Sequence, residues 1–311
     1  MRYGIVGFGC AGYQAAKEIR SLDPKGNIKV FSEHGEAPYN PMLTTYYVSG
    51  KLKRSGAFPF GDLEKIQKEL QLEIESQTRV KHVCGETKTI ILENGKEETF
   101  DRILIATGAR AWAPPITGLD PKKAFFMRTM EDADHLKARI ESSCPRKAIV
   151  VGASMVGIKV VELLRTKGTK VLLADLEPRI FPLAAYEAVS HEIEKRVKDQ
   201  GVELAFGCSI GSVEEKENGF DCTLTDSRHY EADLIVLCIG TRANTGIVDP
   251  QEIQVDRGIL VNEEMETSCP GIYAAGDCSQ GREMQTGKQM IIGLWANAGH
   301  QGATAGHNMA G

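Results

Sequence analysis

Short apolar runs alternate with amphipathic segments along the chain. Residues 3–6 and 148–151 are largely apolar runs of strand length, and each leads into a glycine-rich turn and a stretch with helical spacing of apolar residues. Continuous apolar runs of this kind are typical of strands covered on both faces of a parallel sheet. The pattern therefore predicts two strand–turn–helix units, with helices near residues 13–22 and 158–167.

The segments that follow repeat the same plan. A second strand with an acidic end is predicted after each helix, over residues 28–33 and 170–175. Residues 100–108 and 232–240 also match, because each has an aspartate, an apolar run and then a glycine. Such repetition predicts two βαβ units of the nucleotide-binding type.

The last part of the sequence returns to the first unit. Residues 271–278 predict a further strand without a glycine loop of its own, and residues 295–309 predict a helix. The proline-rich stretch 113–115 predicts a linker. We therefore expect an α/β fold of two Rossmann-like dinucleotide-binding domains, one inserted in the other. The predicted segments are 1–112 and 243–311 for the outer domain and 113–242 for the inserted one.

Two flanking elements are predicted from their periodicity. Residues 60–76 predict one amphipathic helix, because apolar residues recur at spacings of three and four from Leu63 to Ile74. Residues 80–92, followed by a glycine, predict a β-hairpin.

Composition and charge exclude several classes of protein. The chain has 311 residues, enough for two domains, and its net charge is −5. That charge disfavours nucleic-acid binding, for which a basic surface is typical. No apolar run approaches the ~20 residues of a membrane helix, and the N-terminus lacks a basic leader. We expect a soluble, cytoplasmic protein with neither a nucleic-acid nor a membrane partner.

Cysteine and histidine spacing indicates no redox disulfide and no metal site. None of the eight cysteines forms a C-x-x-C pair, and the seven histidines have no usual ligand spacing. Free thiols are the expectation for a chain without a secretory signal.

The first glycine loop carries the chemistry of a dinucleotide site. Gly7 would make the tight turn, Gly9 would let a pyrophosphate approach the backbone, and Gly12 would let helix and strand pack. Glu33 ends a strand about 20 residues further on, where a carboxylate accepts hydrogen bonds from ribose hydroxyls. Strand, glycines, helix and acid in this order predict a dinucleotide site.

The second loop has the form Gly152-x-Ser154-x-x-Gly157. The Ser154 hydroxyl adds bulk but is also able to bond a phosphate. Asp175 ends the next strand and favours a free ribose 2′-hydroxyl, and therefore NADH over NADPH. Arg179 lies nearby and offers an alternative contact for a 2′-phosphate.

Taken together, these motifs resemble the FAD-dependent pyridine nucleotide–disulfide oxidoreductase family, and within it the flavin modules of rubredoxin, ferredoxin and nitrite reductases. The resemblance rests on the following motifs: Gly7-Phe8-Gly9-Cys10-Ala11-Gly12, Ala106-Thr107-Gly108-Ala109, residues 128–133, residues 152–157 and residues 267–278. It implies a glutathione-reductase-like arrangement of the two domains, with FAD on the outer domain and NADH on the inserted one.

The resemblance also implies the binding residues. FAD is expected to contact Gly7, Phe8, Gly9, Cys10, Ala11, Gly12, Glu33, Val80, Ala106, Thr107, Gly108, Asp277, Trp295 and Ala296. NADH is expected to contact Gly152, Ser154, Met155, Val156, Gly157, Asp175 and Gly240.

The sequence departs from the family in three places. Residues 40–45 contain no thiol where disulfide-reducing members carry a cysteine. Thr45 and Lys159 occupy positions where ferredoxin-reductase-like members often have a lysine and a glutamate, and we treat both as flavin-proximal candidates. Because the sequence ends at Gly311, we expect no C-terminal interface domain.

The predicted function is an FAD-dependent oxidoreductase. It would take a hydride from NADH and pass electrons to an acceptor protein or partner subunit, without a redox disulfide. Two alternatives stay open: an NADH oxidase with oxygen as acceptor, and an FAD- and NAD-binding subunit that does not turn over by itself.

Overall fold

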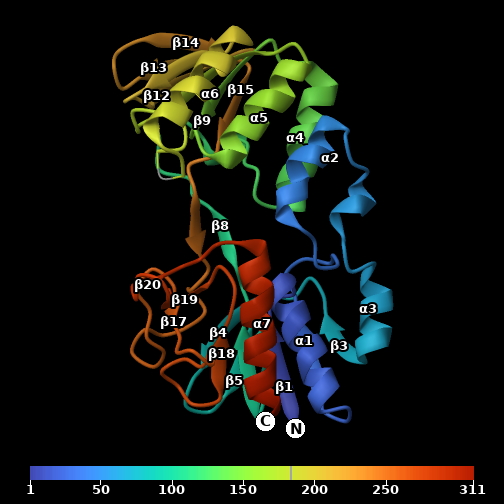
Figure 1. The fold of residues 1–311 in the computed structure, drawn as a ribbon. Helices are drawn as coiled ribbons and strands as arrows, with labels where there is room; N and C mark the ends of the chain where they lie inside the picture. The colour runs from blue at the N-terminus through green and yellow to red at the C-terminus, as the bar shows by residue number, and fades with distance from the viewer. Residues whose placement is uncertain (183) are drawn as a thin grey trace. The chain divides into compact units, whose positions relative to one another are not determined.

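The computed structural model describes residues 1–182 and 184–311, which form two compact units (Figure 1). Unit 1 consists of Met1–Asn40, Ser55–Arg110 and Arg242–Gly311, and unit 2 consists of Pro41–Arg54 and Ala111–Thr241. Each unit is built around a parallel sheet with helices, so the predicted α/β class is confirmed.

The sheet of unit 1 has the strand order β18-β7-β1-β2-β3, and every pair is parallel. Its strands are β1 (Arg2–Val6), β2 (Asn27–Phe31), β3 (Leu72–Glu75), β7 (Arg102–Ile105) and β18 (Ile272–Ala274). Because β18 pairs with β7, the chain does return to its first sheet, as the sequence predicts. The order of neighbours reverses beside β1, which is where Rossmann folds bind their ligands.

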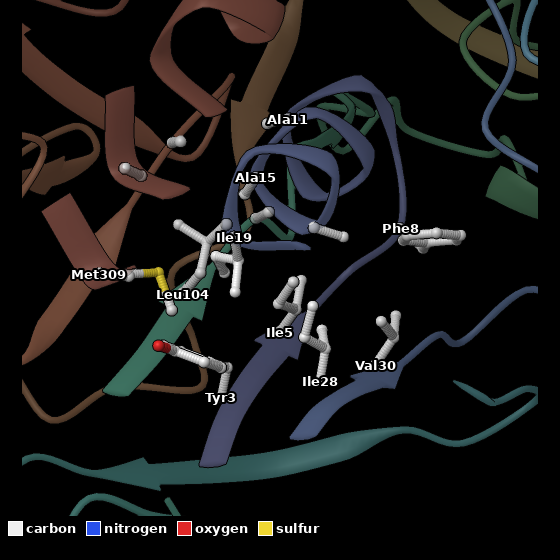
Figure 2. Packing of buried hydrophobic residues seen from close by; sticks show 14 of the residues in the cluster. Tyr3, Ile5, Phe8, Ala11, Ala15, Ile19, Ile28, Val30, Leu104 and Met309 are labelled. Atoms are coloured by element: carbon white, nitrogen blue, oxygen red, sulfur yellow. The ribbon is translucent and has the colours of Figure 1, made fainter. Parts of the chain in front are cut away.

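Alternate residues of these strands serve two cores. Tyr3 and Ile5 point into a cluster beneath α1 (Cys10–Leu22) and α7 (Trp295–Ala310) (Figure 2). Val6 and Ile103 belong to a second cluster. That cluster lies against an antiparallel sheet of β4 (Val80–Cys84), β5 (Thr89–Leu92) and β6 (Glu97–Thr99). The β1 loop and the start of α1 are thus supported from both faces of the sheet.

Small residues let α1 and α7 pack closely (Figure 1). A Cβ on Gly302 would overlap the carbonyl oxygen of Ala11, and one on Gly306 would overlap that of Ala15. The two backbones therefore approach more closely than larger side chains permit.

We expect Gly302→Ala to destabilise the protein by about 1–3 kcal/mol, because the added methyl collides with backbone that cannot rotate away. Gly299→Ala is the matched control on the same helix. Its Cβ would meet only side-chain atoms, 3.3 Å from Cys10 Sγ, and it gains the same helix propensity. Urea unfolding measures both variants, and equal midpoints for the two would contradict this packing argument.

Unit 2 repeats the architecture with the strand order β11-β10-β9-β15, again all parallel. Helices α4 and α5 pack on one face and the β12-β13-β14 sheet packs on the other. The elements are α4 (Met130–Ser143), β9 (Lys147–Val151), α5 (Met155–Thr166), β10 (Lys170–Asp175), α6 (Glu187–Asp199), β11 (Glu203–Phe206), β12 (Ile210–Lys216), β13 (Gly219–Leu224), β14 (His229–Ala232) and β15 (Leu234–Leu237).

One segment of unit 2 comes from early in the chain. Pro41–Arg54 includes α2 (Thr44–Ser49), whose Val48 is buried in the core that α4 and α5 share. The Tyr47 hydroxyl donates to Asp134 Oδ1 at 2.7 Å, and Arg54 forms an ion pair with the same carboxylate. The predicted segments placed these residues in the outer domain, and the contacts that reassign them are remote in sequence.

The predicted single helix over residues 60–76 is wrong. Helix α3 covers only Leu63–Leu70, where Asp62 caps it by accepting from Lys65 N at 2.8 Å. The backbone then turns at Gln71, with φ of 50°, and Leu72–Glu75 forms β3 beside β2. Apolar residues at 70, 72 and 74 fit a strand as well as a helix, and pairing with β2 decided between them. The predicted hairpin is present, with β6 as a third strand.

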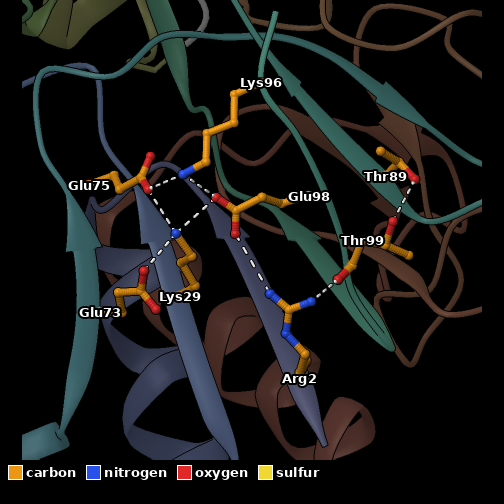
Figure 3. A network of polar contacts seen from close by, with 8 residues as sticks. All are labelled: Arg2, Lys29, Glu73, Glu75, Thr89, Lys96, Glu98 and Thr99. Carbon is orange, nitrogen blue, oxygen red and sulfur yellow. Dashed lines mark hydrogen bonds and ion pairs between the residues drawn. The ribbon is translucent and has the colours of Figure 1, made fainter.

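A buried lysine joins three of these strands (Figure 3). Lys29 on β2 is 4% exposed, and its Nζ lies 2.6 Å from Glu73, 2.7 Å from Glu75 and 2.9 Å from Glu98. Lys96 pairs with the last two carboxylates as well. The hydrogen bond from Lys29 and, to a smaller extent, that from Lys96 lower the pKa of Glu75. Burial would raise the pKa of Glu98, but the same two lysines outweigh it and lower that pKa.

The remaining short elements are η1 (Pro41–Leu43), η2 (Arg54–Ala57), β8 (Ala109–Ala111), η3 (Pro121–Lys123), β16 (Thr241–Ala243), β17 (Ile259–Leu260), β19 (Ser279–Arg282) and β20 (Gln289–Met290). Within the described ranges, no helix combines the length and the apolar character needed to cross a membrane.

Candidate cofactor sites

The first glycine loop connects β1 to α1, and its glycines differ in what they face. A Cβ on Gly7, where φ is +96°, would overlap the carbonyl oxygen of Ala106, and one on Gly12 would overlap that of Gly7. By contrast, a Cβ on Gly9 would have no heavy atom within 4 Å. The fold itself therefore needs glycine at positions 7 and 12, whereas at Gly9 there is open space beside the backbone.

Gly9 is also the N-cap of α1, and no side chain caps this helix end. The first turn contains no acidic residue. N–H groups without a side-chain cap and the positive end of the helix dipole therefore meet at the space beside Gly9. This combination favours a bound anion such as a phosphate.

The other predicted FAD residues also belong to unit 1. Those that follow strands lie at the carboxyl ends of β2, β7 and β18, which meet at one edge because the strands are parallel. Val80 begins β4, and Trp295 and Ala296 begin α7. The strand-end residues are Glu33, Ala106, Thr107, Gly108 and Asp277.

The structure adds Asn244, which the sequence analysis missed. Its side-chain Nδ2 donates to the Thr107 carbonyl at 3.0 Å, and its backbone N donates to the Gly108 carbonyl at 2.9 Å. The Thr107 hydroxyl in turn donates to the Asn244 carbonyl at 2.7 Å. Asn244 therefore fixes the turn after β7, and no spacing rule connects residues so far apart in the chain.

Gln301 on α7 was also missed. Its Oε1 accepts hydrogen bonds from Gly276 N at 2.9 Å and from the Ser279 hydroxyl at 3.3 Å. It thereby holds the turn that carries Asp277. It is the one glutamine among the small residues of this helix, and that is the one signal that the sequence offers.

The second glycine loop connects β9 to α5 in the same way. A Cβ on Gly152, where φ is +107°, would overlap the carbonyl oxygen of Cys238, and one on Gly157 would overlap that of Gly152. Ser154 is the N-cap of α5: its hydroxyl accepts from Gly157 N at 3.3 Å and donates to the Cys238 carbonyl at 3.2 Å. The Ser154 hydroxyl is thus engaged within the protein.

Asp175 connects the end of β10 to this loop. Its Oδ2 accepts from Ala153 N at 2.6 Å, and its Oδ1 accepts from Glu177 N at 2.9 Å. The carboxylate is therefore fixed beside the glycine loop, where a ribose is expected, and each oxygen keeps further lone pairs.

Arg179 does not point into open space. Its guanidinium donates to the carbonyl of Ala185 at 2.8 Å, to the Ser190 hydroxyl at 2.7 Å and to the Pro182 carbonyl at 2.9 Å. These bonds hold it against its own unit, so the structure does not favour it as a partner for a 2′-phosphate.

Thr45 and Lys159 meet in one pocket of unit 2. The Lys159 Nζ lies 2.9 Å from Glu162 Oε2 and 5.5 Å from the centre of the Tyr46 ring. The hydrogen bond to Glu162 raises the pKa of Lys159, which keeps it a cation. The pocket is lined by Thr45, Tyr46, Ser49, Lys51, Lys159, Glu162, Leu163 and Thr166.

The cysteines are free thiols. Cys10 in the first loop is buried, and burial raises its pKa to about 11. Cys278 is buried as well, and its Sγ contacts the Ile105 and Ala275 carbonyl oxygens at 3.3 Å. Neutral buried thiols are poor nucleophiles. Among the described residues, no group of three histidine, cysteine or acidic side chains is arranged to hold a metal ion.

Comparison with known proteins identifies the family. A family model described as pyridine nucleotide-disulphide oxidoreductase matches residues 1–302. The chain belongs to this family. It is 28% identical over 316 residues to an NADH oxidase of Methanocaldococcus jannaschii, in a match that covers 100% of this chain and 70% of that protein.

Two further relatives point the same way. A rubredoxin-NAD(+) reductase of Ectopseudomonas oleovorans is 27% identical over 296 residues, covering 94% of this chain and 76% of that protein. The solved structure of a water-forming NADH oxidase from Lactobacillus brevis, bound to NADH, superposes with a TM-score of 0.93 at 26% identity. That match covers 99% of this chain and 69% of the other. The predicted family is thereby confirmed, with FAD and NADH as its cofactors.

The residues present fit these two cofactors. Gly9 and Gly108 in unit 1, and Gly240 in unit 2, leave space where a Cβ would stand. Trp295 at the start of α7 has a buried indole N–H that finds no acceptor among the residues described here. A buried donor without a partner is costly, and a bound ligand oxygen would satisfy it.

Proposed function

We propose that this protein is an FAD-dependent oxidoreductase that takes a hydride from NADH and passes the electrons to a redox protein or a partner subunit, without a redox disulfide. The observation that carries the proposal is the presence of a strand–glycine loop–helix motif in each unit: Gly9 leaves open space at the uncapped start of α1, and Asp175 is hydrogen-bonded to the second loop. The family membership supports the reaction class.

The residues of unit 1 would hold FAD. The N-terminus of α1 and the open side of Gly9 would bind the pyrophosphate, and Glu33 would accept from ribose hydroxyls. Asn244 would keep the Thr107–Gly108 turn in place beside the cofactor. The chemistry supplied by bound FAD is uptake of a hydride from NADH and release of electrons to an acceptor.

The residues of unit 2 would hold NADH. Asp175 would accept from the adenosine ribose and repel the phosphate of NADPH, and Arg179 is bonded elsewhere. Thr45 and Lys159 are the flavin-proximal candidates, with the Lys159 cation kept in place by Glu162. That last assignment comes from the family resemblance.

The proposed electron acceptor follows from the acceptor that one of the relatives is named for. A rubredoxin reductase among the relatives supports a small redox protein as electron acceptor. The absence of a thiol in residues 40–45 and the buried, neutral Cys10 support electron release without disulfide exchange. The cytoplasmic location stays a prediction.

Oxygen is the second candidate acceptor, because two of the relatives are named as NADH oxidases. Oxygen uptake and reduction of an artificial dye, measured with the same NADH supply, separate the two. Oxygen uptake as fast as dye reduction favours the oxidase. Oxygen uptake much slower than dye reduction favours a protein acceptor.

We expect NADH to bleach the yellow absorbance of the purified protein under anaerobic conditions. NADPH at equal concentration should act at least about tenfold more slowly, because Asp175 opposes its phosphate. Protein whose absorbance NADH leaves unchanged would contradict the proposal. Steady NADH:dye turnover by this chain alone would exclude the alternative of a subunit that does not turn over.

A further inference from the structure

We infer that Arg79 is a positioning residue for FAD, which holds the Glu33 carboxylate so that one of its oxygens stays available to the adenosine ribose. The inference rests on the proposed FAD site in unit 1. It adds a residue that has no place in the glycine loop, the strand-end acids or the helix N-terminus.

The geometry of the pair is one-sided. Arg79 Nε donates to Glu33 Oε1 at 2.9 Å, and a second guanidinium nitrogen donates to the same oxygen. Within the part of the chain that the structure describes, no hydrogen bond or ion pair involves Glu33 Oε2. A carboxylate has about four lone-pair sites. Arg79 therefore takes up one oxygen and leaves the other free to accept from two neighbouring ribose hydroxyls.

Backbone hydrogen bonds bring the two residues together. Thr78 N donates to the Ser32 carbonyl at 2.9 Å, which joins the residue before Arg79 to the residue before Glu33. On its other side, Glu93 N donates to the Arg79 carbonyl at 3.1 Å. Both segments are thus held in register, and the guanidinium reaches Glu33 from a fixed backbone.

The pair contributes little to folding. The Arg79 and Glu33 side chains are 59% and 50% exposed, and an ion pair at such a surface is worth little. The proposed role of the Arg79–Glu33 ion pair is to favour the binding of FAD. FAD carries an anionic pyrophosphate, and a lone carboxylate near it would repel that charge. Arg79 offsets the charge of Glu33 and orients it at the same time, which lowers the ordering cost of binding.

The test uses two flavins. FAD contains the adenosine ribose, whereas FMN lacks it. We expect Arg79→Met to weaken FAD binding to the apoprotein by about tenfold, as loss of a charge-assisted contact implies, and to leave FMN binding unchanged. Arg79→Lys should recover part of the loss, because a single ammonium can pair with Glu33 but cannot fork onto it. Flavin fluorescence titration gives each dissociation constant.

Two further variants sharpen the test. Glu93→Gln is the matched control, because Glu93 Oε1 lies 3.5 Å from Nη1 of the same guanidinium. The Glu93→Gln protein should bind FAD as tightly as the wild type. In a Glu33→Gln background, Arg79→Met should cause no additional loss of FAD affinity. With a neutral amide in place of the Glu33 carboxylate, the guanidinium has no charge to hold, so the two effects are not additive.

The outcomes separate this inference from the proposed function. If the wild type binds FAD and Arg79→Met binds it equally well, the inference is wrong and the proposed function stands. Equal loss of FAD and FMN affinity in Arg79→Met would indicate damage to the fold and would overturn the inference too. A wild-type protein that binds neither flavin would overturn both.

Discussion

Gly9→Val is expected to weaken FAD binding strongly while the apoprotein stays folded. Gly9 has φ of −82° and ψ of −161°, which valine adopts without strain, and no protein atom lies within 4 Å of the added Cβ. The side chain would instead fill the space beside the N-terminus of α1. Overfilling a packed contact costs about 1–3 kcal/mol, so we expect a loss of FAD affinity of up to about 100-fold.

Gly7→Val is the matched control for this result. Gly7 has φ of +96°, and its Cβ would overlap the Ala106 carbonyl, so this variant should lower the unfolding temperature of the apoprotein itself. The ratio of flavin to protein absorbance and the apoprotein unfolding temperature measure the two effects. A Gly9→Val protein that binds FAD as tightly as the wild type would show that the open side of Gly9 is not a ligand site.

Lys29→Met is expected to destabilise unit 1 by about 3 kcal/mol at pH 7. Removing one member of a buried ion cluster leaves its partners as unpaired charges, which typically costs at least this much. Here Glu73, Glu75 and Glu98 would face one another around an apolar side chain. The expected loss of stability is at the low end for a buried ion cluster, because Glu73 is 54% exposed and Lys96 still pairs with the other two carboxylates.

Lys96→Met is the control, since it removes a cation from the same two carboxylates. Lys96 is 51% exposed, so we expect a much smaller loss of stability than for Lys29→Met. Urea unfolding of both variants compares a buried lysine with an exposed one at one cluster. Equal losses would mean that burial of Lys29 does not determine its contribution.

The pH dependence of unfolding offers a second measure of the Lys29 effect. The folded protein lowers the pKa of Glu75 and Glu98 from the ordinary value of 4.5, so their stabilisation is complete above that pH and is lost as the pH falls below it. The difference between wild type and Lys29→Met should therefore shrink in acid, because protonated carboxylates no longer need the lysine. A difference that grows on acidification would contradict the ion-pair account.

Local sequence patterns were sufficient for much of the fold. The strand–glycine–helix order at Gly7 and Gly152, the two strand-end acids and the return of the chain near residue 271 are written within short stretches of sequence. Their physical basis is also local. A few neighbouring residues are enough to form a tight turn, to leave out a Cβ or to make a strand that is buried on both faces. The family resemblance rested on the same short motifs.

Contacts between distant residues decided the rest. Leu72–Glu75 became a strand because β2 offered it a partner, and Pro41–Arg54 joined unit 2 because Val48 and Tyr47 pack on helices far along the chain. The hydrogen bonds of Arg179 within its own unit disfavour the alternative contact with a 2′-phosphate.

By itself, the sequence determined the two dinucleotide-binding units and the loops that carry their chemistry, since these depend on neighbours along the chain. Only the tertiary structure decided which side chains remain available to a ligand. It engaged the Ser154 hydroxyl, oriented Glu33 through Arg79 and brought Asn244 to Thr107. Whether a group is hydrogen-bonded or buried depends on which residues come together in the folded chain. The spacing of residues along one strand or helix does not predict those long-range contacts.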